Sequence, residues 1–171
     1  VYKRQAEVAD LFSKYRLSEA LMAVYKLFWD EFSSWYLEII KPAYGEGIPS
    51  GIHDCTLRFF DNLLHLLHPF MPFITEEIWQ HLYRTEEEIE ESQASLMVDR
   101  ITIDTVVYKD LLTRFETVKE VISNIRSIRL QKNIAQKEAL ELQVIGENPV
   151  AAFNAVITKM CNLSSLDVVE N

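Results

Sequence analysis

One feature above all limits what this chain can fold into: apolar side chains recur every three or four residues through residues 19–40. The line they form comprises Leu21, Val24, Phe28, Phe32, Trp35 and Ile39. An α-helix turns once in 3.6 residues, so this spacing places the whole line on one helix face. Only four glycines and five prolines interrupt the 171 residues, so helix breakers are rare. The chain is therefore predicted to be mainly α-helical.

The same period recurs in most of the sequence up to residue 135. It predicts helices over residues 2–16, 19–40, 52–67, 73–83 and 106–130. The helix at 52–67 is apolar on two faces, which is typical of the middle of a bundle. Residues 85–105 are predicted to be irregular, with a solvated run of glutamates and an extended stretch at 96–103. We expect residues 1–135 to form one helical bundle.

The periodicity changes after residue 135. Leu140, Leu142 and Val144 alternate with other residues, as in a strand. Asn148-Pro149 is a strong helix start, which predicts a helix over 150–160, and a second strand follows at 163–169. Residues 136–171 are thus predicted to be a small strand–helix–strand appendage. A unit of this size needs a support, so we expect it to pack on the bundle.

The sequence offers little for catalysis. Glycines occur only at positions 45, 47, 51 and 146, and none of them forms a phosphate-binding loop between a strand and a helix. His53 and Cys55 are imaginable as a base and a nucleophile, but no residue to orient the base is evident. We expect no catalytic site in this chain.

A metal site is the second chemical alternative. His65 and His68 are three residues apart, and Glu77 and His81 are four apart, so each pair shares a helix face. Zinc needs further ligands at defined spacing, and these are missing. The simpler interpretation is that the histidines line contacts between helices.

Charge is distributed unevenly along the chain. The net charge is −9, which argues against a nucleic-acid partner. Residues 109–137, however, hold seven basic and three acidic residues, a local charge of +4, so the remainder carries −13. A basic segment inside an acidic protein is the best candidate for a phosphate-binding surface.

Within that segment, Lys119, Arg126 and Arg129 are spaced by seven and three residues and therefore share a helix face. Lys132 follows just beyond. Arginine suits phosphate because its planar guanidinium presents several donors in a fixed fork. These four residues are candidates for nucleic-acid binding, and a merely solvated basic face is the alternative.

Aromatic side chains give a second candidate surface. Tyr25 and Trp29 lie at the edge of the apolar line in residues 19–40. They are placed either to stack on bases or to widen the core. Phe28, Phe32 and Trp35 stand at core spacing.

Targeting signals and cysteines point to one compartment. The sequence begins with Val1, has no signal-like start and contains no apolar run long enough for a membrane. Cys55 and Cys161 are far apart and fit reduced thiols. We expect a cytoplasmic fragment of a longer polypeptide.

Three segments carry a resemblance to a known family. They are residues 28–38 (FWDEFSSWYLE) followed by Lys41-Pro42, residues 66–79 (LLHPFMPFITEEIW), and residues 125–129 (IRSIR) followed by Asn133-Ile134. In order and spacing they resemble the anticodon-binding domain of valyl-tRNA synthetases, which are class I aminoacyl-tRNA synthetases. The chain departs from the family pattern in having Ala135 where proline is common and no Trp-Pro after Glu91-Ser92.

The resemblance implies a helical bundle that holds the anticodon stem-loop of a valine-specific tRNA. It also implies a catalytic domain in the same polypeptide that joins valine to tRNA with ATP and magnesium. The ATP-handling signatures of that domain are absent here, so this fragment is expected to catalyse nothing and to need no cofactor. A monomeric, cytoplasmic parent enzyme without a membrane partner is expected.

Two other interpretations remain open. A helical scaffold that docks a protein partner is favoured by the net charge of −9. A parent enzyme specific for isoleucine or leucine is the other. Phe73 argues for valine, because those relatives more often place histidine at this position.

Overall fold

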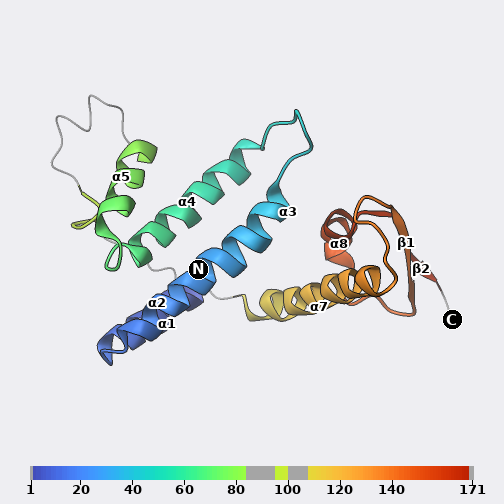
Figure 1. Cartoon of the computed structure of the whole chain (residues 1–171), viewed down its shortest axis with the longest axis horizontal. Coiled ribbons are helices and arrows are strands. Elements are labelled where there is room, and N and C mark those ends of the chain that lie inside the picture. Colours follow the sequence, from blue (N-terminus) through green and yellow to red (C-terminus); the bar gives the residue numbers. More distant parts are fainter. Residues whose placement is uncertain (1, 84–94, 100–107, 170–171) are drawn as a thin grey trace. The chain divides into compact units, whose positions relative to one another are not determined.

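The structure, a computed structural model, describes residues 2–83, 95–99 and 108–169, and helices make up most of it (Figure 1). This confirms the mainly α class. Contacts divide the chain into two units, residues 1–107 and 108–171. The elements of the first unit are α1 (Tyr2–Ser13), α2 (Leu17–Lys26), the π-helix η1 (Leu27–Leu37), α3 (Glu38–Ile40), α4 (Ser50–Leu67) and α5 (Pro72–Tyr83).

The helix predicted over residues 19–40 is present as the continuous run α2–η1–α3, but its middle is π-helical. Leu27 and Phe32 are both buried although they stand five residues apart. Five residues of α-helix would separate their directions by about 140°. The wider turn of a π-helix, with its i→i+5 hydrogen bonds, brings such residues towards one face.

The predicted core line is wrong at its start. Leu21 is 41% exposed, whereas the small Ala20 and the neighbouring Val24 are completely buried. The sequence pattern gave weight to large side chains, but α2 packs closely against α1 and α4 through its small ones. Phe32 is buried as expected, and Phe28 packs partly buried against the same cluster.

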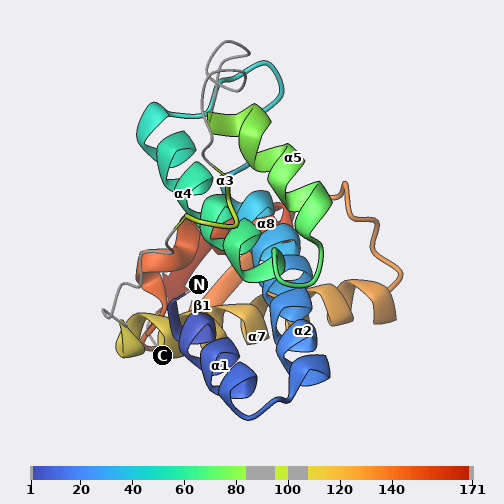
Figure 2. The same cartoon turned by 90° about the vertical axis from the view of Figure 1, so that its left-hand side faces the viewer.

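Helix α4 is buried on two sides, as its two apolar faces predicted. Leu63 and Leu66 belong to the core cluster that includes residues of α1 and α2. Leu64 points into a second cluster with Trp79 of α5 and Leu96. Helix α4 therefore packs against α2 on one side and against α5 on the other (Figures 1 and 2).

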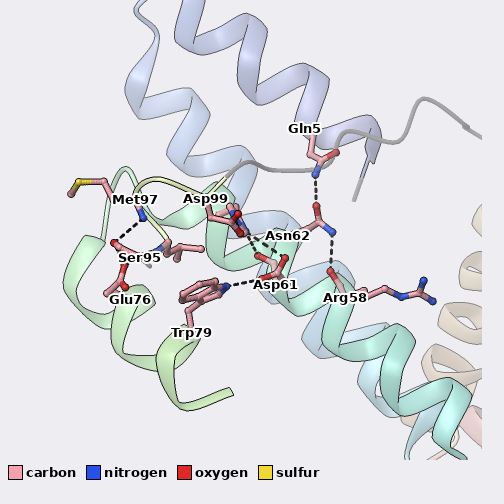
Figure 3. A network of polar contacts seen from close by, with 11 residues as sticks. Gln5, Arg58, Asp61, Asn62, Glu76, Trp79, Ser95, Met97 and Asp99 are labelled. Atoms are coloured by element: carbon pink, nitrogen blue, oxygen red, sulfur yellow. Dashed lines mark hydrogen bonds and ion pairs between the residues drawn. The ribbon is translucent and has the colours of Figure 1, made fainter. Parts of the chain in front are cut away.

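A polar network fixes the short segment 95–99 onto α4 and α5 (Figure 3). The Glu76 carboxylate accepts hydrogen bonds from Ser95 Oγ and from the Leu96 backbone N–H, each at 2.9 Å. Trp79 Nε1 donates to Asp61 Oδ1 at 3.0 Å. Residues 96–98 form a turn, so the extended stretch expected from residue 96 is wrong there; residues 100–103 lie outside the described part.

The pKa values of two carboxyl groups in this network are shifted in opposite directions. Burial raises the pKa of Asp61 above its ordinary value, although the charge of His65 and the hydrogen bond from Trp79 act to lower it. Burial also acts to raise the pKa of Glu76, but the hydrogen bonds from Gln80, Ser95 and Leu96 outweigh it and lower the pKa. Donated hydrogen bonds favour the charged carboxylate, which explains the difference.

The second unit contains the predicted strand–helix–strand motif. Its elements are α7 (Lys109–Gln131), β1 (Leu140–Ile145), the 3₁₀ turn η2 (Ala151–Phe153), α8 (Asn154–Cys161) and β2 (Leu163–Val169). Strands β1 and β2 pair in parallel, with Leu142 opposite Leu166. The Asn148 side chain accepts the Val150 N–H at 3.1 Å, so the predicted helix start is present, although a 3₁₀ turn precedes the regular helix.

Helix α8 packs against both α7 and β2, so the small motif rests on the helix that precedes it. The domain boundary that we expected at residue 135 stays a prediction. The glutamate run at 86–91 lies outside the described residues. None of the described helices is long and apolar enough to span a membrane.

Candidate nucleic-acid interface

The end of α7 carries the basic residues that the sequence singled out. Arg126 is exposed, and its Nη2 donates a hydrogen bond to the backbone carbonyl of Met160, at the end of α8, at 3.3 Å. Lys132 follows as the C-cap of α7 and is exposed. Both side chains therefore stand where a solvent-borne anion can approach.

Arg129 is placed differently from its expected position on an exposed face. It is 1% exposed. Its Nη1 donates to the carbonyls of Ala135 and Glu138 at 3.0 and 2.9 Å, and its Nη2 donates to those of Cys161 and Asn162 at 2.7 and 3.2 Å. Because these carbonyls occupy both terminal guanidinium nitrogens and the Nε atom is itself buried, a phosphate has no access to the group. We therefore correct the assignment: Arg129 supports this region from inside.

The sequence did contain a signal for this burial. The buried line of α7 includes Val118 and Ile122, and half-buried Ile125 continues it. The next step of four residues lands on Arg129. Steps of three and four define a helix face, so Arg129 lies on the core side of α7 and Arg126 does not.

The loop after α7 holds its lysines on a fixed backbone. Asn133 adopts a left-handed conformation with φ of 55°. The Ile134 N–H binds the Arg129 carbonyl at 2.9 Å, which is the bond of a Schellman helix end. Lys132 and Lys137 are both exposed on this loop. Lys137, which we did not single out from the sequence, thus joins Lys132 as a candidate.

Lys119 lies earlier on α7 and is partly buried. Its Nζ is 2.8 Å from Glu116 Oε1 and 6.0 Å from the centre of the Phe115 ring. Lys119 thus forms an ion pair with the Glu116 carboxylate. Among the basic candidates other than the buried Arg129, it is the least available to a new anionic partner.

The aromatic candidates lie in the other unit, at the junction of α2 and η1. Tyr25 is 52% exposed and Trp29 is 57% exposed. Their rings lie nearly parallel, at an interplanar angle of 7°, with centroids 6.4 Å apart. Two exposed, aligned rings on a helix suit stacking by a flat ligand.

The geometry also bears on the metal alternative. His65 Nε2 lies 3.2 Å from Asp99 Oδ2, His68 Nδ1 lies 2.8 Å from Thr75 Oγ1, and His81 Nε2 lies 3.1 Å from Glu77 Oε1. Among the described residues, no group of three or more histidine, cysteine or acidic side chains is arranged to hold a metal ion.

The two cysteines sit in different environments. Cys55 is half-buried on α4, and its neighbour His53 contacts Asp54 at 3.3 Å. Cys161 is buried at the end of α8. Burial raises the pKa of the Cys161 thiol, and the charges of Arg126 and Arg129 offset part of that rise. A buried thiol with a raised pKa is a poor nucleophile.

Comparison with protein families matches residues 1–144 to a known family model. The matching model describes the anticodon-binding domain of tRNA ligases. It spans the helices of the first unit as well as α7.

Curated relatives agree with that match. The chain is 73% identical over 166 residues to a valine–tRNA ligase of Bacteroides thetaiotaomicron, covering 97% of this chain and 18% of that protein. It is 68% identical over 169 residues to the valine–tRNA ligase of Phocaeicola vulgatus, covering 99% and 19%. A valine–tRNA ligase of Pseudothermotoga lettingae is 31% identical over 141 residues, covering 82% and 16%. The chain spans about a fifth of the length of these relatives.

Proposed function

The chain belongs to the family of anticodon-binding domains of tRNA ligases, and on that premise we propose that it binds the anticodon stem-loop of a tRNA. The observation that carries this proposal is the family match over residues 1–144. The exposed cations at the end of α7 provide a chemical reason, because RNA binding requires contacts to phosphate.

The phosphate contacts are assigned to Arg126, Lys132 and Lys137, with a smaller part for Lys119. The first three are exposed, and all four lie in the segment whose local charge is +4. Such contacts position RNA without reading its sequence. The net charge of −9 keeps other surfaces unattractive to RNA, which focuses binding on this one.

Base contacts are assigned to Tyr25 and Trp29. Single-stranded loops are recognised when their bases unstack and are stacked again on aromatic side chains. The two parallel, half-exposed rings offer such a platform. We assign it to a base of the anticodon loop.

For the whole protein we propose ATP-dependent joining of valine to tRNA, with magnesium as the ATP-bound cation. The relatives are valine–tRNA ligases, and this chain corresponds to about a fifth of each. The ATP chemistry is assigned to other parts of the polypeptide. A cytoplasmic, monomeric enzyme completes the proposal. The names of the relatives support valine over isoleucine or leucine.

Salt-dependent RNA binding tests the phosphate contacts. Affinity for a transcribed valine anticodon stem-loop is measured by fluorescence anisotropy at several salt concentrations. The logarithm of affinity falls with the logarithm of salt by about 0.7–0.9 for each phosphate contacted. The variant Arg126→Ala/Lys132→Ala should weaken binding and make this slope shallower by about 1.5.

Arg58→Ala is the matched control, because Arg58 is exposed on α4 outside the basic segment. It should leave the salt dependence unchanged. Equal slopes in all three proteins would remove Arg126 and Lys132 from the interface. Absence of RNA binding at low salt would favour the scaffold that docks a protein partner, which the net charge of −9 supports.

A further inference from the structure

The loop that carries Lys132 and Lys137 is held by side chains from beneath it. Arg129 donates hydrogen bonds to the carbonyls of Ala135 and Glu138. Asn162 Nδ2 donates to the Gln136 carbonyl at 3.1 Å. Backbone carbonyls at 135, 136 and 138 are thus fixed by residues outside the loop.

Arg129 joins this loop to a second segment. The same guanidinium binds the carbonyls of Cys161 and Asn162, where α8 ends. Carbonyls in the last turn of a helix lack partners within the helix and carry partial negative charge. They are therefore well suited to hold a cationic side chain, and the loop is tied to α8 through one residue.

The shape of the guanidinium is needed for this role. Arginine presents its donors in a rigid plane, whereas a lysine ammonium presents three donors from a single point. Lysine cannot span two pairs of carbonyls on separate segments. Arg129→Lys would keep the charge and lose most of the bridge.

We propose that Arg129 is a positioning residue for RNA binding, which fixes the loop presenting Lys132 and Lys137 and touches no RNA itself. This inference rests on the proposed function, because it concerns the same surface. A loop ordered in advance loses less conformational freedom on binding, so its two cations engage phosphates at a smaller entropic cost.

A double-mutant cycle on the full chain tests the proposal. The first arm is Lys132→Ala/Lys137→Ala, which should weaken stem-loop binding by about tenfold. The second is Arg129→Gln, which should weaken binding to a similar degree. In the background without the two lysines, Arg129→Gln should change affinity by less than about twofold, because effects acting through shared partners are not additive.

Full additivity would overturn the proposal, since it would mean that Arg129 contributes on its own. Unchanged affinity in the lysine double variant would instead overturn the phosphate surface itself. The two failures are therefore distinguishable. Arg114→Gln, an exposed arginine on the same helix, controls for the loss of one positive charge.

Arg129→Lys separates positioning from direct contact. A direct phosphate contact would keep its positive charge in this variant, so near wild-type affinity would contradict the proposal. We expect affinity as low as that of Arg129→Gln. Amide NMR spectra of β1 and β2 show whether each variant keeps its fold.

A measurement on the unaltered chain completes the test. On addition of RNA, the side-chain NMR signals of Lys132 and Lys137 should shift. The Arg129 guanidinium signals should stay in place because its carbonyl partners are retained. A large shift of the Arg129 guanidinium signals with no shift at the lysines would overturn the proposal.

Discussion

Arg129 donates a hydrogen bond from Nη2 to the carbonyl of Cys161 at 2.7 Å, and both residues are buried. Because Cys161 is the last residue of α8, this bond joins α7 to the end of the helix packed against it. The positive charge is satisfied by carbonyl dipoles. Arg129, which the sequence pattern made a candidate for RNA binding, thus connects two elements of the second unit.

Replacing Arg129 should loosen the second unit. Arg129→Met fills similar space but removes the donor that four carbonyls share. The carbonyls of Ala135 and Asn162 keep a backbone N–H donor, so the change should destabilise this unit by about 2 kcal/mol. Hydrogen–deuterium exchange should accelerate in β1 and β2 and stay unchanged in α4. Unaltered exchange in both strands would contradict the structural role.

Acid should destabilise the first unit partly through Glu76. Its pKa is lowered in the folded state, so its contribution is present above the ordinary value of 4.5 and is lost as pH falls through the folded pKa. Glu76→Gln cannot gain or lose that proton. Its free energy of unfolding should therefore fall less steeply than that of the wild type below pH 4.5.

Urea denaturation followed by tryptophan fluorescence measures this difference. Glu77→Gln is the control, because Glu77 is the exposed neighbour on the same helix. It should follow the wild-type pH dependence. Parallel curves for all three proteins would mean that the hydrogen bonds from Ser95 and Leu96 do not set the acid response.

Loss of the exposed tryptophan should weaken RNA binding. Stacking of one base on an aromatic ring contributes about 1–3 kcal/mol, so Trp29→Ala should weaken stem-loop binding at least fivefold. Tyr44→Ala removes a fully exposed aromatic residue of the same unit and should leave binding unchanged. Equal effects of the two substitutions would exclude a specific stacking site.

Two leucines test which side chains form the core of the first unit. Leu63 is fully buried on α4, and Leu63→Ala should cost about 3–5 kcal/mol of unfolding free energy. Leu21, which the sequence placed in the core, is 41% exposed, so Leu21→Ala should cost less than about 1 kcal/mol. Similar losses of unfolding free energy in urea denaturation would instead favour the predicted core line, which includes Leu21.

Helix and strand positions followed from hydrophobic periodicity because that signal depends on local geometry. The two faces of α4 and the alternation at Leu140 and Val144 are examples. The π-helix was not predictable in this way, because a pattern scored at 3.6 residues per turn assumes an α-helix. The burial of Ala20 was missed because a small side chain adds little to any pattern.

The candidate site was harder to predict because charge alone does not say where a side chain points. Arg126 and Arg129 are three residues apart, yet one is exposed and the other buried. The carbonyls that hold Arg129 come from residues 6, 9, 32 and 33 positions further along the chain. Such partners become visible only once α7 and α8 are packed.

The most direct test compares two RNAs with the unaltered chain. One is the anticodon stem-loop of a valine tRNA, and the other has the same stem with its three anticodon bases replaced. Binding is measured at the same salt concentration by fluorescence anisotropy. We predict saturable binding of both, at least about tenfold tighter for the valine loop because base contacts add to phosphate contacts. Equal affinities, or no binding to either RNA, would contradict an anticodon-binding function.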